Sequence, residues 1–80
     1  MDKIQKFINR LPAPLDERVT RAIRMIESGM LSNLDVKQMK GAQDIYRCRI
    51  STVRIIFLKA PLGNVVTAVD FRDKVYKKKR

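Results

Sequence analysis

Apolar residues in the first third of the chain recur every three or four positions, as they do along one side of an α-helix. The first stripe consists of Ile4, Phe7, Ile8 and Leu11, and the prolines of the segment 12–14 end it. The second stripe consists of Val19, Ile23, Ile26 and Met30, with Asp16 and Glu17 near its start and Gly29 at its end. These signals predict a short helix and a second helix over about 15–28, which should form a hairpin.

After a predicted loop at 32–35, apolar and polar side chains alternate, which is the pattern of β-strands. In the segment 45–50, Tyr46, Cys48 and Ile50 fall on one side and Arg47 and Arg49 on the other. Strands are predicted over 36–39, 45–50, 53–59 and 65–70, with turns at Gly41, 51–52 and 61–64, and an extended stub is expected at 75–76.

Helices with one apolar side pack economically on the apolar side of a sheet. The predicted fold class is therefore α+β, with an N-terminal helix hairpin on one face of a small, three- to four-stranded antiparallel sheet in a single domain over 1–80. Tyr46, Cys48 and Ile50 should lie under the helices. Arg47 and Arg49 should project from the open face, and Arg54 joins them if the register of the hairpin sets it opposite that pair.

The positive charge is concentrated in the second half of the chain. Residues 1–36 hold six Lys and Arg against five Asp and Glu, whereas residues 37–80 hold twelve against three. Such a field favours polyanionic partners such as RNA or DNA, because neutralising phosphates releases counterions. The outward residues of the second helix, which include Arg18, Arg21 and Arg24, are expected to form a solvated surface instead.

Several classes of protein are disfavoured by the composition. The chain has one cysteine, Cys48, expected to fill a core position, and no histidine, so neither an intramolecular disulfide nor the usual zinc-ligand sets can be assembled from it. The longest apolar run, 55–58, is far shorter than the roughly 20 residues that cross a bilayer, and the charged opening does not resemble a signal peptide. We therefore expect a cytoplasmic protein with no membrane contact and no cofactor.

Ribonuclease chemistry remains accessible to such a chain. Attack on a phosphodiester by the RNA's own 2′-hydroxyl needs in-line positioning, charge stabilisation and proton movement, but no protein nucleophile. Arginines on a sheet face meet the charge requirement, and clustered cations would favour the phenolate form of Tyr76, making it a candidate proton carrier. Tyr46 alternates with Cys48 and Ile50, so it is interpreted as a core aromatic residue.

The ordered set of residues resembles the RelE/ParE superfamily of type II toxin–antitoxin toxins, in its RelE-like branch. The resemblance is carried by Lys40-Gly41, Asp44-Ile45-Tyr46-Arg47 with Arg49, Val53-Arg54-Ile55-Ile56-Phe57, Phe71-Arg72 and Val75-Tyr76. It implies a compact α+β domain, ribosome-dependent cleavage of messenger RNA, and neutralisation by a cognate antitoxin. The ribosome and its messenger are thus expected partners, and no small-molecule cofactor is implied.

The resemblance also implies roles for individual residues. Arg47 and Arg49 look like phosphate-binding and proton-balancing positions, Arg54 like the transition-state charge stabiliser, and Arg72 and Tyr76 like the C-terminal part of the site. The lysines predicted to contact RNA are Lys40, Lys74, Lys77 and Lys78, although the run 77–80 is equally compatible with a solvated tail. Many family members carry a histidine where this chain has Phe71, and most begin with a strand that is not evident here.

Two alternative functions share this fold. A ParE-like toxin inhibits DNA gyrase and lacks the set of basic catalytic residues, so Arg47, Arg49, Arg54 and Tyr76 argue against it. A non-catalytic module would grip RNA or the ribosome through the same basic face without cutting. A supercoiling assay distinguishes the first alternative, and binding without scission distinguishes the second.

Overall fold

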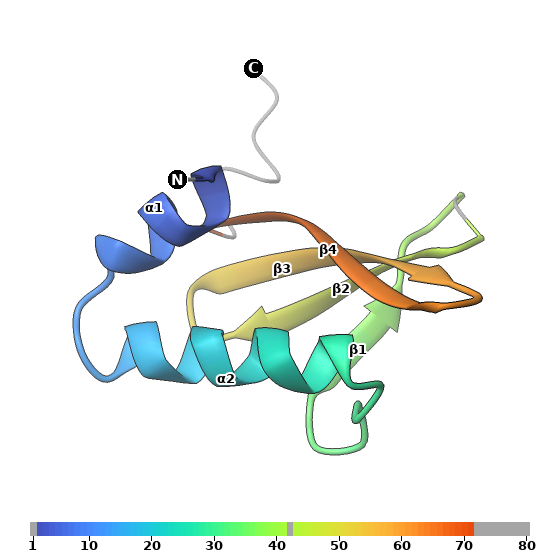
Figure 1. Ribbon diagram of the computed structural model, residues 1–80, viewed down its shortest axis with the longest axis horizontal. Coiled ribbons are helices and arrows are strands. Elements are labelled where there is room, and N and C mark those ends of the chain that lie inside the picture. Colours follow the sequence, from blue (N-terminus) through green and yellow to red (C-terminus); the bar gives the residue numbers. More distant parts are fainter. Residues whose placement is uncertain (1, 42, 72–80) are drawn as a thin grey trace.

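A computed structural model describes residues 2–41 and 43–71 of the 80-residue chain. Two helices precede a four-stranded antiparallel sheet whose strands follow one another in chain order, β1-β2-β3-β4 (Figure 1). The elements are α1 (Lys3–Asn9), α2 (Leu15–Glu27), β1 (Asp35–Gln38), β2 (Ile45–Ile50), β3 (Val53–Ala60) and β4 (Gly63–Phe71). The predicted α+β fold is confirmed, and the predicted stub at 75–76 lies outside the described residues.

Both helices have ends that their local sequence explains. Asp2 caps α1, because its carboxylate accepts a hydrogen bond from the Gln5 backbone N–H at 2.8 Å. The last turn of α2 closes through Gly29, which has a φ of +80° and so occupies the left-handed region. The Met30 N–H then donates to the Met25 carbonyl at 2.8 Å. The expected helix over 15–28 is thus confirmed to within one residue.

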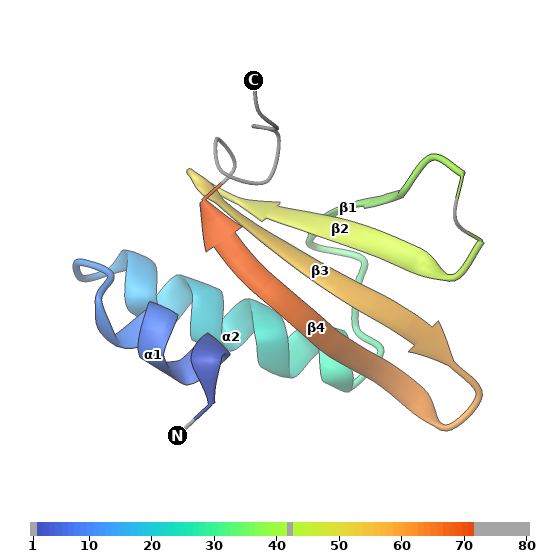
Figure 2. The same cartoon turned by 90° about the horizontal axis from the view of Figure 1, so that it is seen from above.

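The helices meet the sheet differently. α2 contacts β2, β3 and β4, whereas α1 contacts α2 and β4. Figure 2 shows β4 as the edge of the sheet next to the helices, with α1 near the C-terminal end of that strand. The hydrophobic core consists of Ile8, Leu11, Val19, Ala22, Ile26, Cys48, Val53, Ile55 and Phe57. The helix pair therefore does cover one side of the sheet, with α2 crossing it and α1 closing one end.

The strand register confirms which side chains face the helices. Tyr46 pairs with Phe57 and Cys48 pairs with Ile55, and the side chains of Cys48, Ile55 and Phe57 are fully buried. Tyr46 stacks on Phe57 with the ring centroids 5.7 Å apart. We call this side of the sheet the core face. Tyr46 is the core aromatic that the alternation predicted.

Two strands begin earlier than predicted. Asp35, expected in a loop, starts β1 because it pairs with Arg49 of β2. β4 starts at Gly63 because Ala60 pairs with Gly63 across a two-residue turn, and Gly63 adopts a φ of +137°. In each case the added residue pairs with a residue that already belongs to the neighbouring strand.

Within the described ranges, no helix is long and apolar enough to cross a membrane.

Candidate nucleic-acid interface

Arg47, Arg49 and Arg54 lie on the side of the sheet opposite the core face. Each alternates with core residues along its strand, and Arg49 is the direct cross-strand partner of Arg54. The open question of the hairpin register is thereby answered, because Arg54 does join the other two. We call this side, defined by Arg47, Arg49 and Arg54, the arginine face.

The three arginines differ in exposure. The residue Arg54 is only 3% exposed, the side chain of Arg47 is 12% exposed, and Arg49 is half-buried. The expectation that all three project into solvent is therefore wrong for Arg54. It lies on an inner strand, where its cross-strand neighbours are Arg49 and Asp70. A buried guanidinium keeps its charge, so Arg54 adds positive potential from beneath the surface.

Two carboxylates share the arginine face. Asp35 Oδ1 lies 3.7 Å from Arg47 Nη1, and Asp70 is the cross-strand partner of Arg54. Lys37 pairs with Arg47 in the register, so it adds a further cation on this side. Sequence reasoning missed Asp35 because 32–35 was predicted to be a loop, whereas Lys37 and Asp70 fell in predicted strands but were not assigned to a face. The signal that could have identified Asp35 is its spacing of two positions from Lys37, which sets both side chains on one side of a strand, as Arg47 and Arg49 are set on β2.

The acidic residues change the electrostatics of this face. Among the residues that the structure describes, its cations Lys37, Arg47, Arg49 and Arg54 are opposed by the carboxylates of Asp35 and Asp70. The face is therefore cationic but partly neutralised from within. Like charges directly opposite each other destabilise a sheet, so the Arg49–Arg54 pair costs some stability that Asp70 offsets. An arriving anion would complete the neutralisation.

Cys48 is unsuited to nucleophilic chemistry. The pKa of its thiol is raised from 9.0 to about 11, mainly by burial and also by the Asp35 carboxylate, while Arg47 acts in the opposite direction. The residue is fully buried on the core face, so a neutral thiol is held away from any anion on the arginine face. Among the residues described, no group of three His, Cys, Asp or Glu could hold a metal ion.

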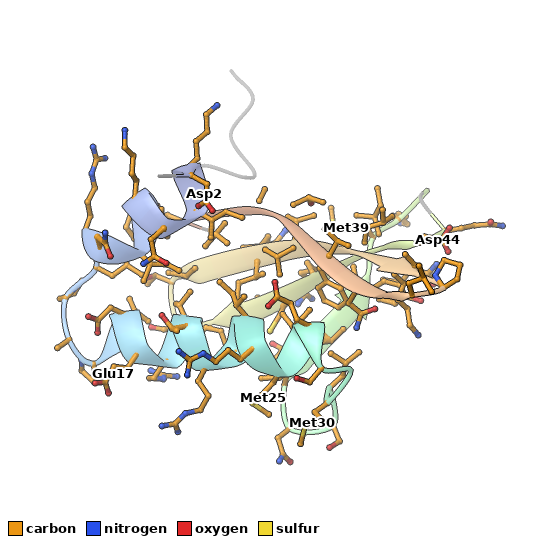
Figure 3. All side chains as sticks on the ribbon, in the orientation of Figure 1. Asp2, Glu17, Met25, Met30, Met39 and Asp44 are labelled. Carbon is orange, nitrogen blue, oxygen red and sulfur yellow. The ribbon has the colours of Figure 1, made fainter. Side chains whose placement is uncertain are left out.

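Lys40 lies apart from the arginines. It follows β1 in the loop that leads to β2, and that loop adjoins the Ile45 end of β2, whereas Arg49 lies near the other end. Met39 and Asp44 of this loop lie at the end of the sheet far from α1 (Figure 3). On the arginine face, this end of the sheet carries apolar side chains, since Ile45 pairs with Leu58 and Leu58 with Val65. The structure does not bring Lys40 together with the arginine cluster.

The remaining predicted residues follow Phe71. Arg72, Lys74, Tyr76, Lys77 and Lys78 all lie outside the described residues. Phe71 itself pairs with Val53, and its ring packs edge-on against Phe7 of α1 with the centroids 5.0 Å apart. The side chain of Phe71 therefore lies on the helix side of the sheet.

Comparison with known proteins supports the fold alone. No family model matches the sequence, and no curated protein matches it significantly. Among solved structures, a chain of the RelB–RelE antitoxin–toxin complex from Methanococcus jannaschii is similar, with a TM-score of 0.75. The two sequences are 22% identical, and the match covers 94% of this chain and 92% of the other. The present chain thus shares its architecture, nearly end to end, with a component of a toxin–antitoxin complex.

Proposed function

We propose that this chain is a RelE-like toxin of a type II toxin–antitoxin system, which cleaves messenger RNA in the cytoplasm while bound to the ribosome. The observation that carries the proposal is the shared side of Arg47, Arg49 and Arg54, on a sheet whose fold resembles a chain of the RelB–RelE complex. Of the segments that carry the resemblance, 45–49 and 53–57 lie on β2 and β3 together with these arginines.

The chemistry follows from the charge on this face. The attacking 2′-hydroxyl must lose a proton, the phosphorane gathers negative charge, and the leaving 5′-oxygen must gain a proton. Arg47 and Arg49 would bind the phosphate through paired N–H donors, and Arg54 would stabilise the added charge from beneath. Arg72 and Tyr76 would complete the site, with Tyr76 moving a proton.

A cognate antitoxin would bind the free toxin. The chain carries a net charge of +10, which suits an acidic, amphipathic segment laid over the sheet or the helices. The similar chain from Methanococcus jannaschii comes from an antitoxin–toxin complex, which supports a partner of this kind. Such a segment would cover the arginine face and keep it from the ribosome.

The decisive experiment maps the ends of a messenger on programmed ribosomes by primer extension. Wild-type protein is expected to produce new ends in the decoding site, and Arg54→Ala should reduce the rate about 100-fold or more, because it removes a charge stabiliser. Arg18→Ala, which removes an exposed cation of α2, is the matched control and should cut normally. Because Arg54 is buried, circular dichroism must show that its variant is folded. Undiminished cleavage by a folded Arg54→Ala protein rejects the assigned role.

Tyr76→Phe provides a second test. It removes the phenol alone, and positioned proton transfer typically contributes ~10²–10⁴ to a rate. We expect a loss in that range, with ribosome association unchanged in a sedimentation assay. A variant that cuts at the wild-type rate would exclude Tyr76 as the proton carrier.

A non-catalytic ribosome-binding module is the second candidate. It is favoured by the absence of histidine from the sequence and by the position of Tyr46 on the core face, away from the arginines. This candidate predicts salt-sensitive ribosome binding with no new messenger ends. Gyrase inhibition in a supercoiling assay, with the messenger left intact, would instead indicate a ParE-like toxin.

A further inference from the structure

A concave site lies between α1 and the C-terminal end of β4, beside the arginine face. Its volume is about 390 Å³, and its lining includes Lys3, Lys6, Phe7 and Arg10 from the helix side and Asp70 and Phe71 from the strand. Asp70 and Phe71 are the cross-strand partners of Arg54 and Val53, so the cavity opens where the arginine face ends at the sheet edge. We call it the α1–β4 cavity.

The cations of this cavity are less compensated than those of the arginine face. Lys3, Lys6 and Arg10 are spaced three and four positions apart, so their side chains share one side of the helix. Across the described chain, none of the three makes an ion pair or a side-chain hydrogen bond, whereas Arg47 has its contact with Asp35. Figure 3 shows long nitrogen-tipped side chains leaving α1 on the side away from α2.

Among the described residues, Asp70 is the only acidic one in the lining. One of its carboxylate oxygens already accepts a hydrogen bond from the Phe71 N–H at 2.7 Å. Three cations against this one carboxylate leave the cavity positive, and the mutual repulsion of the cations would be relieved by a bound anion. A backbone phosphate or a carboxylate would satisfy this requirement equally.

An exposed aromatic ring distinguishes between those two anions. Phe71 is 39% exposed, and its edge-on contact with Phe7 holds the ring at 67° to the Phe7 plane. Every nucleobase offers a face that stacks on such a ring, and proteins that bind single-stranded nucleic acid combine cations with aromatic platforms in this way. An acidic peptide would use the cations and gain less from the ring.

We propose that the α1–β4 cavity binds a nucleotide of single-stranded RNA, with its phosphate on Lys3, Lys6 and Arg10 and its base against Phe71. The inference rests on the proposed function in one respect: the nucleotide in the cavity belongs to the same RNA molecule whose scissile phosphate lies on the arginine face. The strand would pass from Arg49 and Arg54 over the edge formed by β4. The cavity would thus hold RNA that flanks the cleavage point.

The test uses the full chain and a short fluorescein-labelled single-stranded RNA, with binding followed by anisotropy over a range of salt concentrations. The triple variant Lys3→Ala, Lys6→Ala, Arg10→Ala should bind at least about tenfold more weakly, and its log-affinity slope against log salt should fall by about 0.7, because ~0.7 of a counterion is released per neutralised phosphate of a single strand and the cavity holds one phosphate. The charge-matched control is Arg18→Ala, Arg21→Ala, Arg24→Ala on the exposed side of α2, which should keep the wild-type slope. Equal losses in the two triple variants overturn the proposal.

Phe71→Leu tests the stacking part separately. Leucine keeps the apolar contact with Phe7 but removes the ring face, so RNA affinity should fall between about fivefold and a hundredfold with no change in salt slope. Thermal unfolding checks that the variant is folded. A folded variant with wild-type affinity contradicts the stacking role.

Competition with a poly-glutamate peptide distinguishes RNA from an acidic protein segment. If the α1 triple variant loses peptide binding but keeps RNA binding, the proposal is overturned in favour of a protein partner.

Cleavage on programmed ribosomes is measured in parallel. A wild-type protein that binds RNA through α1 but leaves no new ends supports the cavity and rejects the ribonuclease. Normal cleavage by wild type and by the α1 variant, with equal RNA affinity, rejects the cavity alone.

Discussion

The two faces of the same sheet have opposite energetic roles, although their residues alternate along the same strands. On the core face, Cys48, Ile55 and Phe57 are fully buried against the helices, so their interactions are completed inside the molecule. On the arginine face, Asp35 and Asp70 offset only part of the charge of Lys37 and the arginines. A single two-residue period therefore separates the residues that hold the fold from those left for a partner.

The largest effect should come from truncating the core face. Phe57→Ala removes a fully buried ring that stacks on Tyr46, and such truncations typically cost ~3–5 kcal/mol of the free energy of unfolding. The adjacent Leu58→Ala, at a position 37% exposed on the other side, should cost about 1 kcal/mol. Urea denaturation followed by circular dichroism measures both. Equal costs would contradict the assignment of the two faces.

A second effect concerns the pH dependence of the core. The pKa of Cys48 is raised by burial from 9.0 to about 11, so the folded state holds this proton more tightly than the unfolded state does. The resulting stability is fully present below pH 9.0 and is lost as the pH rises to about 11, which amounts to about 3 kcal/mol.

Cys48→Ala provides the control for that measurement. The variant is less stable than the wild type below pH 9.0 because it leaves a small cavity, but it lacks the thiol titration. The difference in the free energy of unfolding between wild type and variant should therefore shrink across the window from 9.0 to about 11. A difference that stays constant over this range would show that Cys48 does not titrate with a raised pKa.

The smallest effect sharpens the account of the arginine face. Asp35→Asn removes the carboxylate that lies 3.7 Å from Arg47, in a pair whose acidic partner is 62% exposed. Stability should fall by about 0.5–1 kcal/mol, and less at high salt. RNA affinity should rise severalfold, because one more positive charge is left uncompensated.

Asp44→Asn is the matched control for that substitution. Asp44 is exposed in the loop before β2. Its substitution removes the same charge at the end of the sheet far from the arginines. It should change stability and RNA affinity less than Asp35→Asn does. Denaturation and anisotropy on the same samples provide both quantities, and a larger rise in affinity for Asp44→Asn would contradict the internal neutralisation.

Much of the fold was predictable because its signals are local. The stripe through Val19, Ile23 and Ile26 predicts α2, and Gly29 correctly marks its end. The alternation in 45–50 correctly assigns Cys48 to the core and Arg47 and Arg49 to the other face. The spacing of apolar residues determines which side chains share one side of a helix or strand. Burial of the apolar side then determines which side faces the protein interior.

The parts that were not predictable depend on neighbouring elements. β1 is short and mostly exposed, and only its pairing with β2 makes Asp35 a strand residue. The burial of Arg54 depends on the packing around it and not on its strand alone, since Leu58 on the same strand and face is 37% exposed, and its own sequence neighbours do not reveal this. The α1–β4 cavity joins residues from opposite ends of the chain, so no motif could indicate it.

Because each strand pairs with the next one along the chain, the sheet is a simple meander whose contacts are mostly local. Local contacts generally allow rapid folding, so the hairpins can form one after another once the C-terminal half of the chain has been synthesised. The contacts between residues far apart in the sequence form when the helices dock on the sheet. They include a hydrogen bond from the Asn64 side chain to the Ile26 carbonyl, 38 positions away. The arginine face would then acquire its geometry early, and the docking of the N-terminal helices would be the step that sets its lifetime.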